Sequence, residues 1–185
     1  MTVIPGFFGG VLTPMAFAEE TVFVPVINLP LVFTDTTSEF DLATATGEMV
    51  ALRASDGNVR WRTAVETFFS GGATVANDVV FGAGLDGIVR AFDIATGEER
   101  WRFQADAGIN AALAVAGDML FVPAGAGLIG GQGATPTTEL LAFRLDGAVV
   151  GARRSRHRLR LEPGSVVLVR TIHHDARLPH GRYSA

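Results

Sequence analysis

The sequence predicts an all-β fold, a partial β-propeller of about three four-stranded blades. Three observations predict it: a motif that recurs at a spacing of 40 residues, a strand-turn-strand pattern before each motif, and a tryptophan at the same place in two copies. The 22 glycines suit many tight turns better than long helices. Because one small sheet cannot bury both faces alone, we expect the blades to stack on one another.

The first half of each repeat is a short strand, a polar or glycine-containing pair, and a second strand. Three segments share this pattern: residues 14–23, 73–81 and 113–121. In each of them an apolar residue stands six positions before a phenylalanine, and the pairs are Phe17 with Phe23, Val75 with Phe81, and Val115 with Phe121.

The second half of the repeat is a strand, a glycine turn and a strand that carries tryptophan. Residues 51–61 align with residues 91–101, so that Gly57 and Gly97, and Trp61 and Trp101, are each 40 positions apart. In the second copy we predict strands at 88–93 and 99–103, joined by a turn at 95–97 in which glycine supplies a positive φ. A third copy begins at Leu141 and keeps Gly147, but Gly151 stands where tryptophan is due.

This motif, A-[LF]-x-x-x-x-G-x-x-x-W preceded by x-G-x-[VL], resembles the repeat of PQQ (pyrroloquinoline quinone) dehydrogenases. It is equally similar to the repeat of related non-enzymatic propellers, which include the outer-membrane β-barrel assembly lipoprotein. The resemblance covers about residues 10–150 and implies that Trp61 and Trp101 dock between blades. We assign residues 1–150 to the propeller and expect loops at 26–46 and 124–138, where no periodicity is seen. The alternative is a β-sandwich with chance similarity.

The composition changes at residue 151. Residues 1–150 contain 17 Asp and Glu against 7 Arg, whereas residues 151–185 contain 2 acidic residues against 8 Arg and hold all four His. Our hypothesis is that residues 151–185, an Arg/His-rich tail, are translated from a shifted reading frame and that the chain is a fragment. A basic arm that binds phosphate is the alternative, but no aromatic residue is interleaved with the eight Arg as in nucleic-acid binders, and we expect no nucleic-acid binding. The segment 165–172 is a predicted strand in either case.

Other motifs give little support for a catalytic site. Gly82–Gly87 and Gly125–Gly130 both fit G-x-G-x-x-G, but the first precedes a strand and the second a glycine- and proline-rich stretch, so both are interpreted as hairpin turns. His173, His174, His180 and Asp175 do not have the spacing of metal ligands on a helix. We therefore predict no catalytic residue and no metal site.

The resemblance leaves two functions open. One is a binding or scaffold module, or an inactive fragment of one; the other is part of a PQQ-dependent alcohol or sugar dehydrogenase. The enzymes of this family hold PQQ and calcium at the propeller axis beside a catalytic Asp, often with adjacent cysteines, but this chain has no cysteine. Its Asp56, Asp93 and Asp146 stand at turn positions, so we predict no cofactor for this chain and no activity of its own.

The expected partners are other proteins, or a second copy of the chain, bound through open blade edges. Relatives are usually exported to the periplasm or cell envelope. The N-terminus has small residues at Ala16 and Ala18 after an apolar stretch, but its prolines and glycines argue against a signal peptide. No run of apolar residues is long enough to predict a transmembrane helix.

Overall fold

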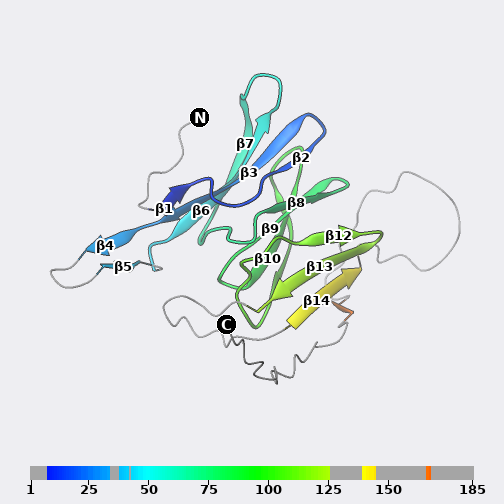
Figure 1. Ribbon diagram of the computed structural model, residues 1–185. Coiled ribbons are helices and arrows are strands. Elements are labelled where there is room, and N and C mark those ends of the chain that lie inside the picture. Colours follow the sequence, from blue (N-terminus) through cyan, green and yellow to red (C-terminus); the bar gives the residue numbers. More distant parts are fainter. Residues whose placement is uncertain (1–7, 34–37, 42, 126–138, 145–165, 168–185) are drawn as a thin grey trace, which may run out of the picture.

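The computed structural model describes residues 8–33, 38–41, 43–125, 139–144 and 166–167, and every regular element within them is a strand (Figure 1). No helix in this described part could cross a membrane. The strands are β1 (Phe8–Gly10), β2 (Ala16–Ala18), β3 (Thr21–Leu29), β4 (Leu31–Phe33), β5 (Ser38–Phe40), β6 (Thr46–Arg53), β7 (Val59–Val65), β8 (Ala73–Ala76), β9 (Val79–Ala83), β10 (Ile88–Asp93), β11 (Glu99–Gln104), β12 (Ala114–Ala116), β13 (Met119–Ala124), β14 (Glu139–Arg144) and β15 (Val166–Val167).

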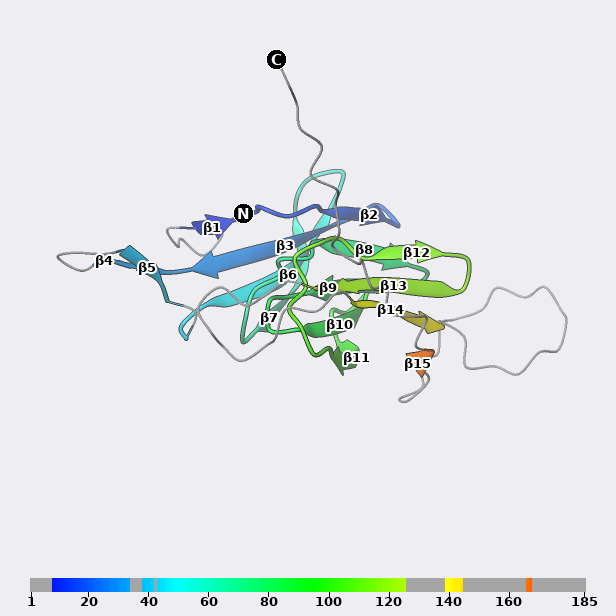
Figure 2. The same ribbon diagram turned by 60° about the horizontal axis from the view of Figure 1, so that its bottom comes forward.

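The strands form three main antiparallel sheets, which we call blades 1, 2 and 3. Blade 1 has the order β1-β3-β6-β7, with β2 also paired to β3; blade 2 has the order β8-β9-β10-β11 and blade 3 the order β12-β13-β14-β15. The inner strands β2, β8 and β12 lie next to one another in a row (Figure 2). The all-β, partial-propeller prediction is therefore confirmed.

The three blades share one register. In each blade the phenylalanine of the second strand lies opposite an alanine of the third strand, and that alanine lies opposite one residue of the fourth strand. These sets are Phe23, Ala51 and Trp61 in blade 1, Phe81, Ala91 and Trp101 in blade 2, and Phe121, Ala142 and Val167 in blade 3. The repeat seen in the sequence is thus a repeat of strand pairing.

The predicted strands and turn of the second copy are confirmed. β10 spans Ile88–Asp93 and β11 spans Glu99–Gln104. Between them Gly97 has a φ of 75° and donates its backbone N–H to the carbonyl oxygen of Asp93 at 2.9 Å. Glycine is needed here because side chains disfavour this left-handed conformation.

The loop predicted at 26–46 is wrong. β3 continues to Leu29 and pairs with β6 as far as Asn28 opposite Thr46, and β4 and β5 form a hairpin between them. Pro25 is tolerated within β3 because the far edge of β3 pairs with β2 up to Phe23 and with β1 only from Ile27. Of the other predicted loop, at 124–138, only residues 124 and 125 lie within the described residues.

Blade 3 takes its fourth strand from the tail. The strand predicted at 165–172 is present at Val166–Val167, which pairs with Ala142 and Phe143 of β14. The residue at the register position of the tryptophans is therefore Val167 rather than the predicted Gly151, which lies outside the described residues together with most of the tail. The shifted-frame hypothesis and the boundary at residue 151 remain predictions.

Two hydrophobic clusters join the blades. One lies between blades 1 and 2 and contains Phe23, Met49, Trp61, Val80 and Phe92 among its buried residues. The second lies between blades 2 and 3, where buried Phe81 and Ala91 pack in the same cluster as Leu120 and Phe143. Blade 2 thus buries both faces against its neighbours, and blades 1 and 3 each bury one face against blade 2, as stacking of the repeats requires.

Candidate functional site

Trp61 links blade 1 to the glycine turn of blade 2. Its side chain is 9% exposed and its indole Nε1–H donates to the carbonyl oxygen of Ile94 at 2.8 Å. Its ring centroid lies 5.9 Å from that of Phe23. The indole therefore buries its apolar ring and satisfies its one polar group in the next blade.

The indole of Trp61 packs directly against the backbone of Gly97. A Cβ atom at Gly97 would lie 2.5 Å from Cε3 of Trp61, a distance that real Cβ atoms do not adopt. The hydroxyl of Thr63, two residues after Trp61, donates to the carbonyl oxygen of Gly97 at 2.6 Å. Glycine is thus required here both for the turn and for the close approach of the indole.

Gly57 forms the same turn in blade 1. It has a φ of 71° and donates its N–H to the carbonyl oxygen of Arg53 at 2.8 Å, as Gly97 does with Asp93. A Cβ atom at Gly57 would meet no atom within 4 Å. Gly147, the third glycine of the predicted set, lies outside the described residues.

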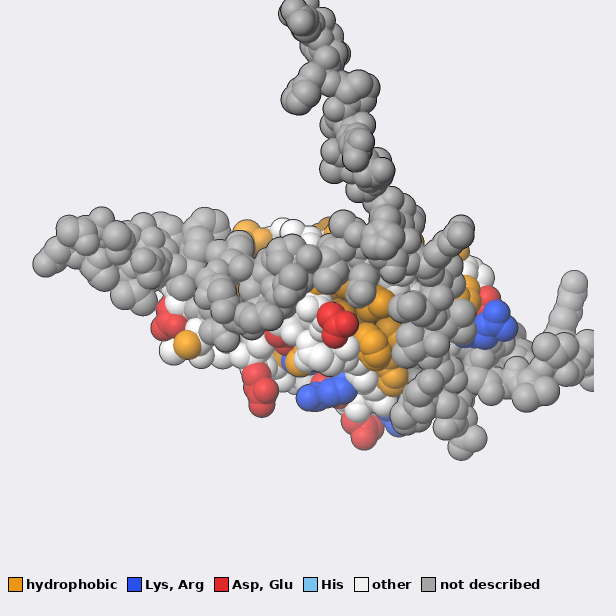
Figure 3. All heavy atoms as spheres, turned by 90° about the horizontal axis from the view of Figure 1, so that it is seen from below, with side chains coloured by type: hydrophobic (Ala, Val, Ile, Leu, Met, Phe, Trp, Pro, Cys, Tyr) orange, Lys and Arg blue, Asp and Glu red, His pale blue; other side chains and the backbone are white. Residues whose placement is uncertain are grey.

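Trp101 lies between blades 2 and 3 in an aromatic cluster. Its ring stacks on Phe103 with centroids 6.2 Å apart and meets the ring of Phe143 edge-on at 5.3 Å. Trp101 and Phe103 are half-buried. Figure 3 shows hydrophobic side chains gathered on the face seen from below, with acidic and Arg side chains beside them.

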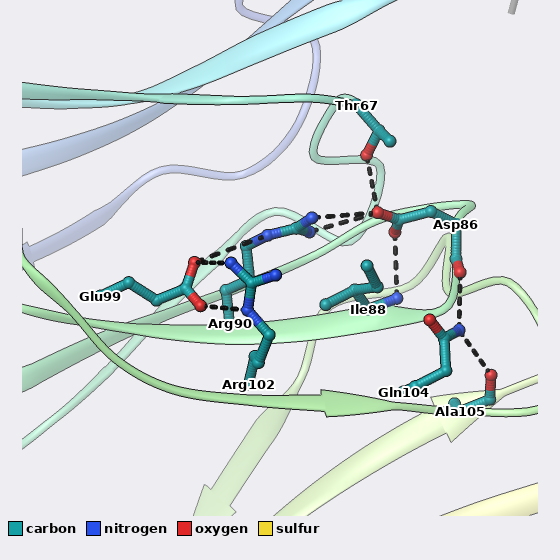
Figure 4. A network of polar contacts seen from close by, with 8 residues as sticks. All are labelled: Thr67, Asp86, Ile88, Arg90, Glu99, Arg102, Gln104 and Ala105. Carbon is teal, nitrogen blue, oxygen red and sulfur yellow. Dashed lines mark hydrogen bonds and ion pairs between the residues drawn. The ribbon is translucent and has the colours of Figure 1, made fainter. Parts of the chain in front are cut away.

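A charged cluster lies at the joint between blades 1 and 2 (Figure 4). We call it the Asp86 cluster; its charged members are Asp86, Arg90, Glu99 and Arg102. Asp86 Oδ2 accepts from both terminal nitrogens of Arg90, at 3.2 and 3.3 Å, and from the hydroxyl of Thr67 at 2.9 Å. Asp86 Oδ1 accepts the backbone N–H of Ile88 at 3.0 Å.

The other half of the Asp86 cluster is centred on Glu99. Its carboxylate forms an ion pair with Arg90 at 3.8 Å and accepts from Arg102, whose NH2 lies 3.0 Å from Oε2. The two carboxylates and two guanidinium groups thus neutralise one another. Since Thr67 belongs to the connection between β7 and β8, the cluster ties that connection to the sheet of blade 2.

The Asp86 cluster was not predicted from the sequence, although one signal could have revealed it. Arg90 precedes the paired alanine of blade 2, and the matching residues are Val50 in blade 1 and Leu141 in blade 3. The side chain of Arg90 is 4% exposed. An arginine at a position that is apolar in the other repeats indicates a buried charge with partners.

The first G-x-G-x-x-G motif is a hairpin turn, as predicted, because it connects the antiparallel strands β9 and β10. A Cβ atom at Gly82 would lie 2.6 Å from the ring of Phe69, and one at Gly84 would lie 2.5 Å from the carbonyl oxygen of Phe68. These glycines therefore allow the connection from blade 1 to pack against blade 2. In the second motif only Gly125 lies within the described residues.

Asp93 holds the glycine turn of blade 2 together. Burial acts to raise the pKa of Asp93, but this is outweighed by hydrogen bonds from the backbone N–H groups of Thr96 and Ala95, the Thr96 hydroxyl and Arg100, so that its pKa is lowered. Both N–H groups lie 2.9 Å from Oδ1. The ionised form is therefore the stabilising one.

The variant Asp93→Asn is expected to lower the free energy of unfolding by about 1 kcal/mol at neutral pH. Because the pKa of Asp93 is lowered in the folded state, its contribution is complete above the unfolded pKa of about 4 and is lost as the pH falls through the folded pKa. Urea unfolding at several pH values should show a difference from the wild type that shrinks on acidification. Asp106→Asn, at an exposed position, is the control, and a difference that does not change with pH would contradict the role of the carboxylate.

The described residues do not fit the calcium that the resemblance implies for the enzymes of this family. Calcium takes about six to eight oxygen ligands, but the oxygens of Asp86 and Glu99 are engaged by hydrogen-bond donors and guanidinium groups. Across the described ranges no group of three His, Cys, Asp or Glu is arranged to hold a metal ion.

Comparison with known proteins agrees with this architecture. The family model described as outer membrane protein assembly factor BamB matches residues 13–161. No curated protein sequence matches the chain.

Among solved structures, a quinohemoprotein alcohol dehydrogenase from Pseudomonas putida HK5 has a TM-score of 0.57 and 20% identity, over 83% of this chain and 29% of the enzyme. The quinohemoprotein alcohol dehydrogenase from Comamonas testosteroni has a TM-score of 0.53 and 19% identity, over 81% of this chain and 28% of the enzyme. At these identities the likeness establishes the propeller fold alone. The chain spans less than a third of either enzyme.

Proposed function

This chain belongs to the family of the outer membrane protein assembly factor BamB, and on that basis we propose that it is a protein-binding propeller module of the cell envelope. The match over residues 13–161 is the observation that carries the proposal. We further propose that Trp61 and Trp101, with Gly57, Gly97 and Gly147, serve blade docking rather than chemistry.

The Asp86 cluster supports a structural role for the charged residues. A catalytic base or acid needs a carboxyl group that can reach a substrate proton, whereas Asp86 and Glu99 are engaged by Arg90, Arg102 and Thr67. Buried charges that pair with one another in this way fix the geometry of a joint. The module would therefore act through its surface.

Open blade edges are a surface suited to such binding. An extended segment can add to the edge of a sheet through main-chain hydrogen bonds, with side-chain pockets that select it. Partners of this kind in outer-membrane assembly would be β-strands of barrel proteins that have not yet closed. The name of the matched family favours this class of partner.

A photo-crosslinking experiment tests the proposal. The chain, exported to the periplasm, would carry a photoreactive amino acid at Met15, which is 56% exposed, and captured proteins would be identified by mass spectrometry. We expect outer-membrane β-barrel proteins or components that assemble them. Capture of no such protein, with the chain folded by circular dichroism, would overturn the proposal.

The second candidate is a part of a PQQ-dependent alcohol or sugar dehydrogenase, which the fold shared with the two alcohol dehydrogenases favours. It predicts that the chain with PQQ and Ca²⁺ reduces an artificial dye when an alcohol or a sugar is added. Substrate-dependent reduction would establish this second function. We expect none, because the described residues do not fit a calcium site.

A further inference from the structure

The Gly97 turn of blade 2 binds one short segment of blade 1. The carbonyl oxygen of Ile94 accepts the indole N–H of Trp61 at 2.8 Å. The carbonyl oxygen of Gly97 accepts the hydroxyl of Thr63 at 2.6 Å. Trp61 and Thr63 are two residues apart on β7, so their side chains point to the same side of the strand. The turn thus recognises a tryptophan that is followed, two residues later, by a hydroxyl side chain.

The Gly57 turn of blade 1 has the same backbone structure. The two glycines have φ angles of 71° and 75°, and three backbone hydrogen bonds of 2.8 to 3.0 Å recur in both turns. The N–H groups bond from Arg53 to Asn58, from Ala54 to Glu20 and from Gly57 to Arg53 in blade 1, and from Asp93 to Glu98, from Ile94 to Asp78 and from Gly97 to Asp93 in blade 2. The carbonyl groups of Ala54 and Gly57 are therefore equivalent to those of Ile94 and Gly97.

The Gly57 turn is accessible, whereas Trp61 covers the Gly97 turn. Ala54 and Gly57 are exposed, while Ile94 and Gly97 are buried. The carbonyl oxygen of Ala54 accepts no hydrogen bond from any residue that the structure describes. A Cβ atom at Gly57 would meet no atom within 4 Å, but one at Gly97 would meet the indole. The Gly57 turn therefore presents to solvent the surface that the Gly97 turn presents to Trp61.

Apolar side chains lie beside the Gly57 turn. They form one row across the strands of blade 1, made of Phe17, Val22, Leu52 and Val59. The ends of the row, Phe17 and Val59, are 65% and 43% exposed. The equivalent of Phe17 in blade 2 is Val75, which packs in the same cluster as Trp61. Farther along this face of blade 1 are the buried residues Val24, Val26 and Val50. A partner could thus reach the face only at the end beside the turn.

We propose that the Gly57 turn binds an extended segment of a partner protein in which tryptophan is followed, two residues later, by serine or threonine. The indole packs against Gly57 and donates its N–H to the carbonyl oxygen of Ala54. The hydroxyl donates to the carbonyl oxygen of Gly57. Phe17 adds an apolar contact to the ring. The contact repeats the one that Trp61 and Thr63 make with the next blade.

This inference rests on the proposed function and names the feature by which a partner is recognised. Strands of outer-membrane barrels carry aromatic residues in the girdles at both membrane interfaces. Before the barrel closes, such a strand is extended and presents an indole and the side chain two residues later to the same side. We therefore expect barrel strands that contain Trp-x-Ser or Trp-x-Thr to be the preferred partners of the Gly57 turn.

A peptide with the sequence of β7, Val59–Val65, tests the proposal because it contains the segment that the Gly97 turn binds. The peptide carries 5-fluorotryptophan at the position of Trp61, and its fluorine NMR signal is followed as the full chain is added. We expect a change of the signal that saturates. The same peptide with Thr63→Val should bind about two- to tenfold more weakly, because it lacks one hydrogen bond.

Gly57→Ala in the full chain should weaken peptide binding by about tenfold, because the new Cβ atom would collide with the bound indole. Gly117→Ala is the matched control. Gly117 lies in the turn between β12 and β13, has a φ of 61°, and also has no atom within 4 Å of an added Cβ. Alanine there causes similar backbone strain away from the site, so binding should be unchanged. If circular dichroism shows that Gly57→Ala is unfolded, Phe17→Ser replaces it and should also weaken binding.

Three results would overturn the proposal. These are a fluorine signal that shows no saturable change, equal binding by Gly57→Ala and Gly117→Ala, and equal binding of the peptide and its Thr63→Val variant. Photo-crosslinking at Met15 is scored separately. Capture of barrel proteins by a chain that does not bind the peptide at Gly57 would remove this inference and leave the proposed function intact.

Discussion

Trp61→Ala is expected to lower the free energy of unfolding by about 3 to 5 kcal/mol, the usual range for removing a large aromatic side chain from a core. Trp61 is almost fully buried, contacts Phe23, and is held by Ile94 and Gly97 of the next blade. Its loss would leave a cavity at the joint between blades 1 and 2. Urea unfolding followed by circular dichroism measures the change.

Trp61→Phe is the control that separates packing from hydrogen bonding. It retains an aromatic ring but removes the indole N–H that donates to Ile94 at 2.8 Å. We expect a loss of about 1 to 2 kcal/mol beyond the change in ring size, because the carbonyl oxygen of Ile94 would be left without that donor. If Trp61→Ala is as stable as the wild type, the indole does not hold the blades together.

Arg90→Leu is expected to lower the free energy of unfolding by about 3 kcal/mol, since removing one member of a buried ion pair leaves its partner uncompensated. Arg90 is paired with both Asp86 and Glu99. Leucine itself fits the position, because Leu141 occupies it in blade 3. The loss would therefore come from the carboxylates rather than from the shape of the side chain.

Arg102→Leu provides the matched control for this variant. Arg102 also pairs with Glu99, but its side chain is 62% exposed. Exposed ion pairs contribute little, so we expect a change of about 1 kcal/mol or less. Equal losses for the two variants would show that burial of Arg90 does not determine its effect.

The repeat itself could be predicted from the sequence because each copy needs the same turn and the same packing residue at the same position of the blade. Gly97 and Gly57 mark turns with positive φ, and Trp61 and Trp101 mark the fourth strands. These positions follow from backbone geometry and from stacking, which leave a signal at a fixed spacing. The strands predicted at 88–93 and 99–103 follow for this reason and are present as β10 and β11.

The parts that depart from the repeat could not be predicted. Among the described residues, the hairpin β4–β5 and the long β3 occur in blade 1 alone, so no second copy marks them. The strand at Val166–Val167 was predicted, but its pairing with β14 as the fourth strand of blade 3 was not, because it is far from the place that the spacing gives. For the Asp86 cluster the sequence signals a buried charge at Arg90, but not its partners, because these come from β11 and two connections that only the fold brings together.

The indole of Trp61 in blade 1 packs against the Gly97 turn of blade 2. Comparing the stability of Gly97→Ala with that of Gly57→Ala tests this contact most directly. Both glycines have a positive φ, 75° and 71°, so alanine costs about 1 to 2 kcal/mol of backbone strain at either position. Only at Gly97 would the new Cβ collide with Trp61. We predict that the free energy of unfolding of Gly97→Ala is lower than that of Gly57→Ala by about 1 to 3 kcal/mol, which is the cost of overpacking a core. Equal losses of stability for the two variants would contradict the account.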